Sequence, residues 1–276
     1  MAESLGPYTA FEVIVARGAE SSPTTAQVAT EVPLTIKVNS TELATLMCTP
    51  IHVEALCVGF LMGAGVIDKA CEILDYRCDT ARWEARLTVQ HDPDPTLLHR
   101  RLFTSGCGRG VVFASAVEIA ARHPISNDLT LHRDQITAAM SWLLGSSEAY
   151  RTSGGMHTAA LCLDGAVPDA SMDDVGRHNA VDKIIGDALM KGTDLARCAL
   201  LCTGRTSTDM LHKAKRAGIP ISVSRGTPTH QAVLQARSMG LTVVGRARRG
   251  GFTVYSHPQR IEGLTPPTPA PHPAAR

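Results

Sequence analysis

Regular spacing of apolar residues predicts strands in the first third of the chain. From residue 34 to residue 38, leucine, isoleucine and valine occupy every second position, which is the period of a strand with one buried face. Asn39-Ser40 supplies a turn into a second strand at residues 43–48, so the two strands form a hairpin. A further strand is predicted at residues 11–17, and a second hairpin at residues 73–78 and 83–89.

Other segments of the first half lack this alternation. Residues 18 to about 30 are rich in serine, threonine and proline, and we interpret them as a loop. After Pro50, residues 51–62 are almost continuously apolar and are closed by glycines, which predicts a buried helix. The longest apolar stretch, residues 53–67, contains Glu54 and is too short to cross a bilayer, so we expect no membrane span.

The second half of the chain repeats a helix, a glycine and an apolar strand. One helix is predicted from Arg133, where apolar residues recur at helical spacing. Three later helices each end at a glycine and lead into a strand, which is typical of crossovers that build a largely parallel sheet covered on both faces. These helices are expected at residues 179–190, 208–217 and 230–239, the strands after them at 198–203, 219–224 and 241–246, and further strands at 157–163 and 252–257.

Composition and charge narrow the class of protein. The 276 residues are 44% hydrophobic and 19% charged, the balance of an ordinary folded chain with one large or two small domains. A formal net charge of +1 argues against a broad nucleic-acid surface, so any anion site must be local. We expect four segments: residues 1–30 with a strand and a flexible stretch, 31–125 as a β-rich subdomain, 126–262 as an α/β subdomain, and 263–276 as a disordered proline-rich tail.

The cysteines indicate a reducing compartment. The chain carries eight cysteines, without a Cys-x-x-Cys pair, and most of them lie in apolar segments. The N-terminus has no basic segment leading into an apolar run, so we expect no secretory signal. We therefore interpret the cysteines as reduced thiols of a cytoplasmic protein, packed as small hydrophobic groups.

Cys107 differs from the other cysteines. It lies in Thr-Ser-Gly-Cys-Gly-Arg-Gly, residues 104–110, where glycines on both sides leave room for a large partner to reach the sulfur. Arg109 would stabilise a thiolate, the form that attacks or accepts sulfur. From this segment alone, Cys107 is either a working nucleophile or an idle thiol in a glycine-rich turn.

Two turns at the ends of predicted strands share a composition. Residues 203–207 and 224–229 each offer a glycine, hydroxyl groups, an arginine and the start of a helix, which together make an anion site. In such sheets ligands bind at the carboxyl ends of the strands. The alternative is that the hydroxyls only cap helices and the arginines are solvated. The candidate residues for a phosphate or diphosphate ligand are Arg205, Ser207, Arg225 and Thr227.

Residues 173–183 form the densest polar run of the chain. Asn179 is expected to cap the following helix, with Asp182 and Lys183 pointing away from its buried face. Upstream of that cap, titratable groups surround a glycine. Either they form the wall of a site, in which the histidine transfers a proton near neutral pH, or they form a charged loop with a core histidine. These groups are Asp174, Arg177 and His178.

A third glycine turn and a partial zinc motif complete the candidates. The turn at residues 153–157 ends in His157, which either faces the same cleft or packs at the start of a strand. His52-Val53-Glu54 matches half of the zinc deaminase signature, but the Pro-Cys-x-x-Cys half is absent. Cys48 and Cys57 lie close to His52 without an evident fourth ligand, so we expect no metal site.

Several motifs of this chain occur together in one known family. The longest is Asp174-Val175-Gly176-Arg177-His178-Asn179-Ala180-Val181-Asp182-Lys183. The others are Glu31-Val32-Pro33-Leu34 with Asn39, Met47-Cys48-Thr49-Pro50, Gly59-Phe60-Leu61, the Cys107 segment, Gly154-Gly155 with His157, Ala217-Gly218-Ile219-Pro220, and Val254-Tyr255 with His257-Pro258. From about residue 31 to residue 261 the chain resembles the FdhD family, the formate dehydrogenase accessory sulfurtransferases. The long polar run makes this resemblance highly specific.

This resemblance implies an α/β fold, a three-layer cytidine-deaminase-like mixed sheet with an N-terminal β-rich subdomain, in a homodimer without the deaminase zinc. It implies a sulfur carrier that receives sulfur from a cysteine desulfurase as a persulfide on Cys107. The sulfur passes to a bound bis-guanine-dinucleotide molybdenum cofactor, which is then inserted into formate dehydrogenase. The residues in the position of the family's cofactor-binding segment are Phe252, Thr253, Val254, Tyr255, Ser256 and His257.

The chain departs from the family pattern near the key cysteine. Gly110 stands where many members have a second cysteine, so a persulfide on Cys107 is still expected, but its resolution through a local disulfide is not. Ser40 and Ala64 replace a glycine and a glutamate of relatives and affect the scaffold. Two rival functions stay open: a chaperone that binds the cofactor without sulfur transfer, and a zinc hydrolase or deaminase, which would need stoichiometric metal.

Overall fold

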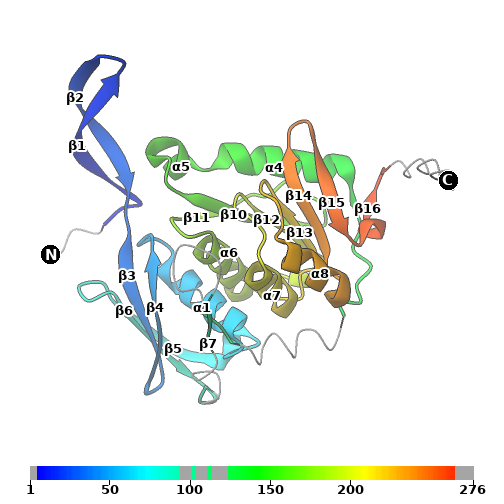
Figure 1. Ribbon diagram of the computed structural model, residues 1–276. Coiled ribbons are helices and arrows are strands. Elements are labelled where there is room, and N and C mark those ends of the chain that lie inside the picture. The colour runs from blue at the N-terminus through cyan, green and yellow to red at the C-terminus, as the bar shows by residue number, and fades with distance from the viewer. Residues whose placement is uncertain (1–4, 94–100, 104–110, 114–123, 265–276) are drawn as a thin grey trace, which may run out of the picture.

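The chain is built on a central six-stranded mixed sheet (Figure 1). The computed structural model describes residues 5–93, 101–103, 111–113 and 124–264. The three middle strands run parallel, and the flanking strands run antiparallel to their neighbours. In order across the sheet the strands are β11 (Ser171–Asp174), β10 (His157–Leu163), β12 (Cys198–Cys202), β13 (Ile221–Ser224), β14 (Thr242–Arg248) and β15 (Gly251–Ser256).

Strand β12 shows why a continuous apolar run forms the middle of this sheet. Its side chains alternate between two apolar clusters: Leu200 packs in the larger cluster, and its neighbours Ala199 and Leu201 pack in the smaller one on the opposite face. A strand covered on both faces has no solvent side, so it carries no polar positions. Helix α4 (Arg133–Ser146) covers the smaller cluster, and α6 (Arg177–Met190), α7 (Thr208–Arg216) and α8 (His230–Met239) cover the larger one (Figure 1).

A second, four-stranded sheet packs through a helix onto this layer. In β3 (Val32–Val38) every second side chain is buried, as the alternation predicts. Helix α1 (Val53–Ala64) lies between this sheet and α6. One apolar cluster continues from β3 through α1 to the large sheet. The predicted boundary between two subdomains at residue 125 stays a prediction. The other strands of the sheet are β4 (Thr41–Cys48), β5 (Ile73–Asp79) and β6 (Glu84–Val89), in the order β4-β3-β6-β5.

Helices α1 and α6 cross with backbone in contact with backbone. A methyl group placed on Gly186 of α6 would lie 1.9 Å from the Ala55 carbonyl oxygen of α1. A methyl group on Gly59 of α1 would lie 1.9 Å from the Asp182 carbonyl oxygen of α6. Both positions therefore require glycine, and this crossing joins the two sheets into one body.

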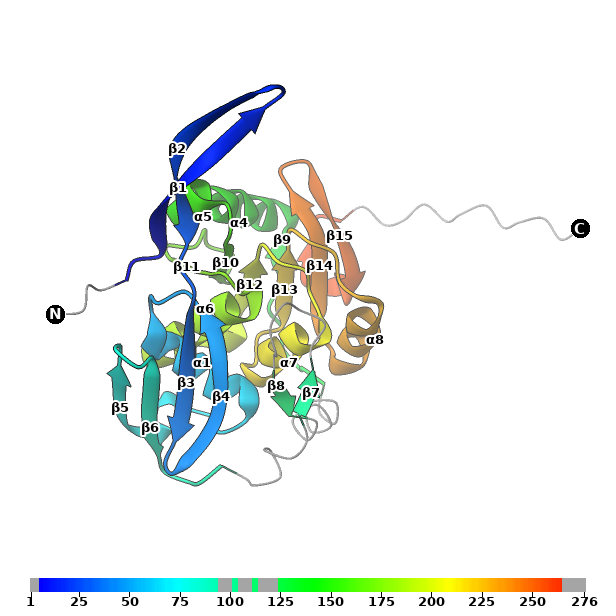
Figure 2. The same cartoon turned by 60° about the vertical axis from the view of Figure 1, so that its left-hand side comes forward.

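The predicted loop at residues 18–30 is wrong. Residues Glu20–Ala29 form β2, which pairs along its whole length with β1 (Tyr8–Arg17), and Gly18 takes a positive φ of 61° in the connecting turn. Threonines and Val28 suit an extended strand, but with both faces exposed the strand has no apolar alternation to reveal it. The ribbon of β1 and β2 projects from the body (Figure 2).

The remaining elements are short and lie outside the two larger sheets. The predicted helices and paired strands are present within a few residues of their expected limits. No helix in the described part of the chain is long and apolar enough to span a membrane. The short elements are α5 (Glu148–Ser153), β7 (Arg101–Phe103), β8 (Val111–Phe113), β9 (Leu131–His132), β16 (Ile261–Glu262), and the 3-10 turns η1 (Ala70–Glu72), η2 (Leu195–Arg197) and η3 (Pro258–Arg260).

The glycine crossing gives a stability prediction. Gly186→Ala forces α1 and α6 apart and is expected to lower the free energy of unfolding by about 3 kcal/mol or more. Gly145→Ala is the matched control, because Gly145 also lies in a helix but faces open space. The control is expected to be neutral or to stabilise by up to about 1 kcal/mol. Urea unfolding of both variants checks this, and equal effects would contradict the proposed crossing.

Candidate functional site

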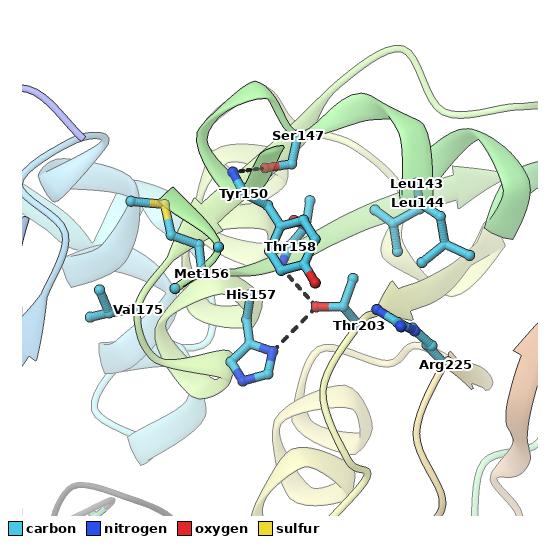
Figure 3. A pocket seen from close by; sticks show the side chains of 12 residues that line it. Leu143, Leu144, Ser147, Tyr150, Met156, His157, Thr158, Val175, Thr203 and Arg225 are labelled. Atoms are coloured by element: carbon cyan, nitrogen blue, oxygen red, sulfur yellow. Dashed lines mark hydrogen bonds between the residues drawn. The ribbon is translucent and has the colours of Figure 1, made fainter. Parts of the chain in front are cut away.

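The ends of several strands and helices meet at one edge of the six-stranded sheet. Strands β12 and β13 end there, the antiparallel β10 begins there, and α6, α7 and α8 start from the adjoining turns. Helix N-termini favour anions because their first N–H groups lack helical partners. A pocket of about 260 Å³ opens at this edge beneath α4 and α5 (Figure 3). Its lining includes Ser147, Tyr150, Met156, His157, Thr203 and Arg225.

His157 and Thr203 form the floor of this pocket (Figure 3). The Thr203 hydroxyl lies 3.3 Å from His157 Nδ1 and accepts a hydrogen bond of 3.0 Å from the Thr158 amide. Burial, followed by the charge of Arg177, lowers the pKa of His157 below its ordinary value. The imidazole is therefore neutral at pH 7 and has one nitrogen that donates and one that accepts.

Arg177, the first residue of α6, packs directly on Gly204 after β12. A methyl group on Gly204 would lie 2.7 Å from Arg177 Cβ, so no larger residue leaves the arginine in place. The Nε and Nη2 atoms of Arg177 are buried without a hydrogen-bond partner among the described residues. A buried guanidinium with unmatched donors is a ready receptor for an oxyanion.

His178, the next residue, turns toward α7. Its Nε2 contacts the Asp209 carboxylate, and both side chains are largely buried. Burial alone would raise the pKa of Asp209, but the hydrogen bond and charge of His178 outweigh it and hold that pKa well below its usual range. Asp209 is therefore ionised at neutral pH and fixes the orientation of the His178 ring.

Deeper along the same helices, Asp182 and Lys213 form a second buried pair. Lys213 Nζ lies 2.5 and 2.6 Å from the two Asp182 carboxylate oxygens. The expectation that Asp182 and Lys183 point away from the buried face is wrong, since both side chains are almost fully buried. Their charges are tolerated because each has an opposite charge within hydrogen-bond distance.

The Asp174 carboxylate at the end of β11 fixes the start of α6. Its Oδ1 accepts from the Gly176 amide (2.8 Å) and from Asn179 (2.9 Å), and its Oδ2 accepts from the Thr49 amide (3.1 Å). Lys183 Nζ lies 2.7 Å from Oδ2. The predicted capping role of Asn179 is therefore wrong. Gly176 occupies the N-cap, and the Asn179 amide holds Asp174 instead.

The two turns of similar composition lie side by side. The Ser224 hydroxyl donates to the Gly204 carbonyl, and a methyl group on Gly226 would lie 2.9 Å from Arg205 Cα. Arg225 and Thr227 are exposed, and so is Arg205. Ser207 is 2% exposed at the start of α7, so its hydroxyl does not reach the surface. The structure thus brings Arg205, Arg225 and Thr227 to the edge that carries Arg177 and His178, and leaves Ser207 beneath it.

A model of the FdhD/NarQ family matches residues 29–262. The chain belongs to the FdhD/NarQ family. It is 36% identical over 240 residues to the "Sulfur carrier protein FdhD" of Staphylococcus aureus strain MRSA252, covering 86% of this chain and 90% of that protein. The same-named protein of strain JH9 is 35% identical over the same shares.

The fold agrees with a solved structure of the same family. A protein described as a formate dehydrogenase accessory protein from Desulfotalea psychrophila matches with a TM-score of 0.76 and 26% identity, covering 92% of this chain and 99% of that chain. The predicted family and the α/β fold class are confirmed. The sheet is less parallel than the helix-glycine-strand repeats predict. Its three central strands run parallel, whereas β10, β11 and β15 run antiparallel to their neighbours.

The six residues predicted to bind the cofactor, 252–257, lie on β15 at the edge of the sheet or directly after it (Figure 1). Because β15 runs antiparallel to β14, Phe252 lies near the same edge of the sheet as Arg177. His257 lies near the opposite edge. Ser256 is buried, with its hydroxyl donating to the Leu241 carbonyl. Of the remaining residues, Thr253 is exposed, and Val254 and Tyr255 pack partly against the two cores. None of these six lines the pocket described above.

The predicted nucleophile Cys107 lies outside the described residues, in the segment between β7 and β8. Burial raises the pKa of Cys48 and Cys198 to about 12 and of Cys202 to about 11. Those thiols are protonated at neutral pH and do not act as nucleophiles. Among the residues that the structure describes, no group of three or more histidine, cysteine or acidic side chains is placed to hold a metal ion.

Two residues of the candidate site are not indicated by the sequence pattern. Asp209 lies in the first turn of a predicted helix, where an acidic residue ordinarily complements the helix dipole, so nothing marked it as the partner of His178. Tyr150 comes from α5, a helix of six residues that the sequence pattern did not indicate. Asp209 and His178 come from different helices, α7 and α6, which a local sequence pattern does not connect.

The His178–Asp209 pair gives a pH-dependent stability prediction. A depressed pKa means that the Asp209 carboxylate contributes stability above its ordinary pKa of about 4, and that this stability is lost as pH falls toward the folded-state pKa. Asp209→Asn is expected to lower the free energy of unfolding by on the order of 3 kcal/mol at pH 7. The difference from wild type should shrink as pH falls below about 4.

Urea unfolding between pH 7 and pH 3 measures this difference. Asp75→Asn is the control, because the Asp75–Arg77 pair is exposed, and it should change stability by less than about 1 kcal/mol. A wild-type minus Asp209→Asn difference that stays constant over this pH range would contradict the assigned pair.

Proposed function

We propose that this chain is a sulfur carrier that accepts sulfur on Cys107 as a persulfide from a cysteine desulfurase. It transfers that sulfur to a bis-guanine-dinucleotide molybdenum cofactor destined for formate dehydrogenase. The names of the S. aureus and D. psychrophila relatives support a sulfur-carrier role in formate dehydrogenase maturation. A cytoplasmic location and a homodimer, which the resemblance implies, belong to the same proposal.

The observation that carries the proposal is the unmatched guanidinium of Arg177 at an edge made of helix starts. The cofactor is a substrate with diphosphate groups, so its binding requires fixed donors and little side-chain bulk. Arg177 supplies buried N–H donors, Gly204 leaves room for Arg177 to pack on the first turn, and Gly226 lets the second turn pack closely against Arg205. Because the two turns are adjacent, one diphosphate is able to contact both, and Arg225 stands at the rim.

The sulfur step is a displacement at the outer sulfur of a donor persulfide. The Cys107 thiolate attacks that sulfur, a new S–S bond forms, and the donor cysteine leaves as a thiolate with the electron pair of the broken bond. For Cys107 to return to a thiolate, its outer sulfur must leave as a neutral atom, which the acceptor metal reduces to sulfide with two of its own electrons. Cys107 alone suffices, in agreement with glycine at position 110.

The two histidines of the site suit proton handling near the bound substrate. His157 is neutral and half-buried on the pocket floor, where it can donate or accept a hydrogen bond. His178 contacts the ionised Asp209, which holds its ring in one orientation at the wall of the site. We assign His178 and Arg177 to the wall of the cofactor site, with Arg205, Arg225 and Thr227 at its rim.

The first prediction concerns Cys107. Wild-type protein incubated with a cysteine desulfurase and cysteine should gain the mass of one sulfur atom on the peptide that contains Cys107. Cys107→Ala should lack this adduct and should not restore formate dehydrogenase activity in cells without the native protein. A Cys71→Ala variant is the control, because Cys71 is an exposed cysteine on η1. Full restoration by Cys107→Ala would instead support a cofactor-binding chaperone.

The second prediction concerns the anion site, with GDP as the probe for half of the dinucleotide cofactor. Arg177→Gln removes a charged donor and should weaken GDP binding roughly tenfold or more, the effect of losing one or two charge-assisted hydrogen bonds. Arg82→Gln, an exposed arginine on the turn between β5 and β6, should bind GDP like wild type. Titration calorimetry measures both, and unchanged affinity in Arg177→Gln would remove the proposed phosphate site.

A further inference from the structure

The C-terminal part of the chain has a one-sided charge distribution. No aspartate or glutamate occurs between Asp209 and Glu262, whereas arginine and lysine recur throughout this stretch. The whole chain has a net charge of only +1, so the acidic residues lie elsewhere along the sequence. An asymmetry of this kind gives a protein a local positive field without making it basic as a whole.

The fold gathers four of these arginines beside the candidate site. We define the arginine strip as Arg225, Arg246, Arg248 and Arg249, all exposed. The Arg246 amide donates to the Gly226 carbonyl at 2.7 Å, which places the end of β14 against the turn that carries Arg225. Because β14 runs parallel to β12 and β13, its carboxyl end lies at the same edge of the sheet.

An irregularity in β14 turns these side chains outward. The pairing of β14 with β15 shifts register between Gly245 and Arg248, and Arg246 has a φ of 56°. Ala247 stays buried in the cluster under α4, while the arginines on either side of it are exposed. A bulge of this kind re-aims side chains, and here it presents guanidinium groups at the rim of the site.

In the described part of the chain, no neighbouring acid neutralises these charges. Within the described residues, no ion pair involves Arg225, Arg246, Arg248 or Arg249. The acidic residues at the site are buried in pairs of their own, Asp209 with His178 and Asp174 with Lys183. The strip extends beyond the pocket, which includes only Arg225 among its lining residues. Arg246, Arg248 and Arg249 therefore present positive charge that the small-molecule site does not use.

We infer that the arginine strip docks an acidic surface of the protein that receives the cofactor. This inference rests on the proposed function for the identity of that recipient. A cofactor held at this edge of the sheet leaves past the rim, so the recipient must cover the rim. Matched surface charge orients two proteins during encounter and raises their association rate. The strip is short and the net charge low, which favours a protein partner over nucleic acid.

The test is the double charge reversal Arg246→Glu with Arg248→Glu, neither of which we place in the cofactor site. The probe is the formate dehydrogenase subunit of the same organism, purified without its cofactor. Its association rate with the variant at low salt should fall roughly tenfold or more relative to wild type, and the difference should shrink in high salt. The matched control, Arg77→Glu with Arg82→Glu, makes the same charge change on the four-stranded sheet and should leave the rate unchanged.

Each outcome bears on the inference separately from the proposed function. GDP affinity and persulfide loading of Cys107 should be unchanged in the strip variant. A wild-type association rate in the strip variant, an equal loss in the control, or a loss only of loading by the desulfurase would overturn the inference. So would binding of a short DNA duplex as tight as that of the subunit. If wild-type protein neither binds GDP nor takes up sulfur, the proposed function fails, and the association rates still decide whether the strip docks this subunit.

Discussion

A single buried carboxylate, that of Asp174, joins the two halves of this protein at the candidate site. It is fully buried, as is the ammonium group of Lys183 beside it. Withdrawing two charges from water is costly, and such a pair is stable only when every remaining donor and acceptor is matched. Here Asp174 accepts from Thr49, Gly176 and Asn179, and Lys183 donates to the Thr49 and Asp173 carbonyls.

The direction of these bonds explains why the site forms where it does. Thr49 directly follows β4 of the four-stranded sheet, whereas Asp174 ends β11 and Lys183 lies in α6. The network therefore fixes the start of α6 against both sheets, and that start carries Arg177 and His178. The glycine contact between α1 and α6 sets the spacing of the same helix farther along. Arg177 reaches Gly204 and His178 reaches Asp209 because α6 is held at both places.

Local patterns predicted the elements of this fold well, and the long-range contacts poorly. The alternation in β3 and the helix-glycine-strand repeats each describe one element, and these were confirmed. The repeats also predicted part of the strand arrangement, because parallel crossovers place the turns at residues 203–207 and 224–229 at one edge of the sheet. Residues 20–29 were misjudged because a strand exposed on both faces lacks alternation.

The errors in the polar run have a common physical cause. Asn179 and Lys183 carry side chains typical of a cap and of a solvated helix face, yet both serve a buried carboxylate. Whether a polar group is buried depends on a partner far away in sequence, such as Thr49, and no local spacing contains that information. The family motif identified these residues as important, and the structure shows what they contact.

The account depends on where the diphosphate of the substrate binds, and a crystal structure of the protein with bound GDP measures that directly. It should show the diphosphate within hydrogen-bonding distance of Arg177 Nη2 and of backbone amides in the turns at Gly204 and Gly226. A diphosphate bound instead toward the His257 end of β15, away from Arg177, would contradict the account.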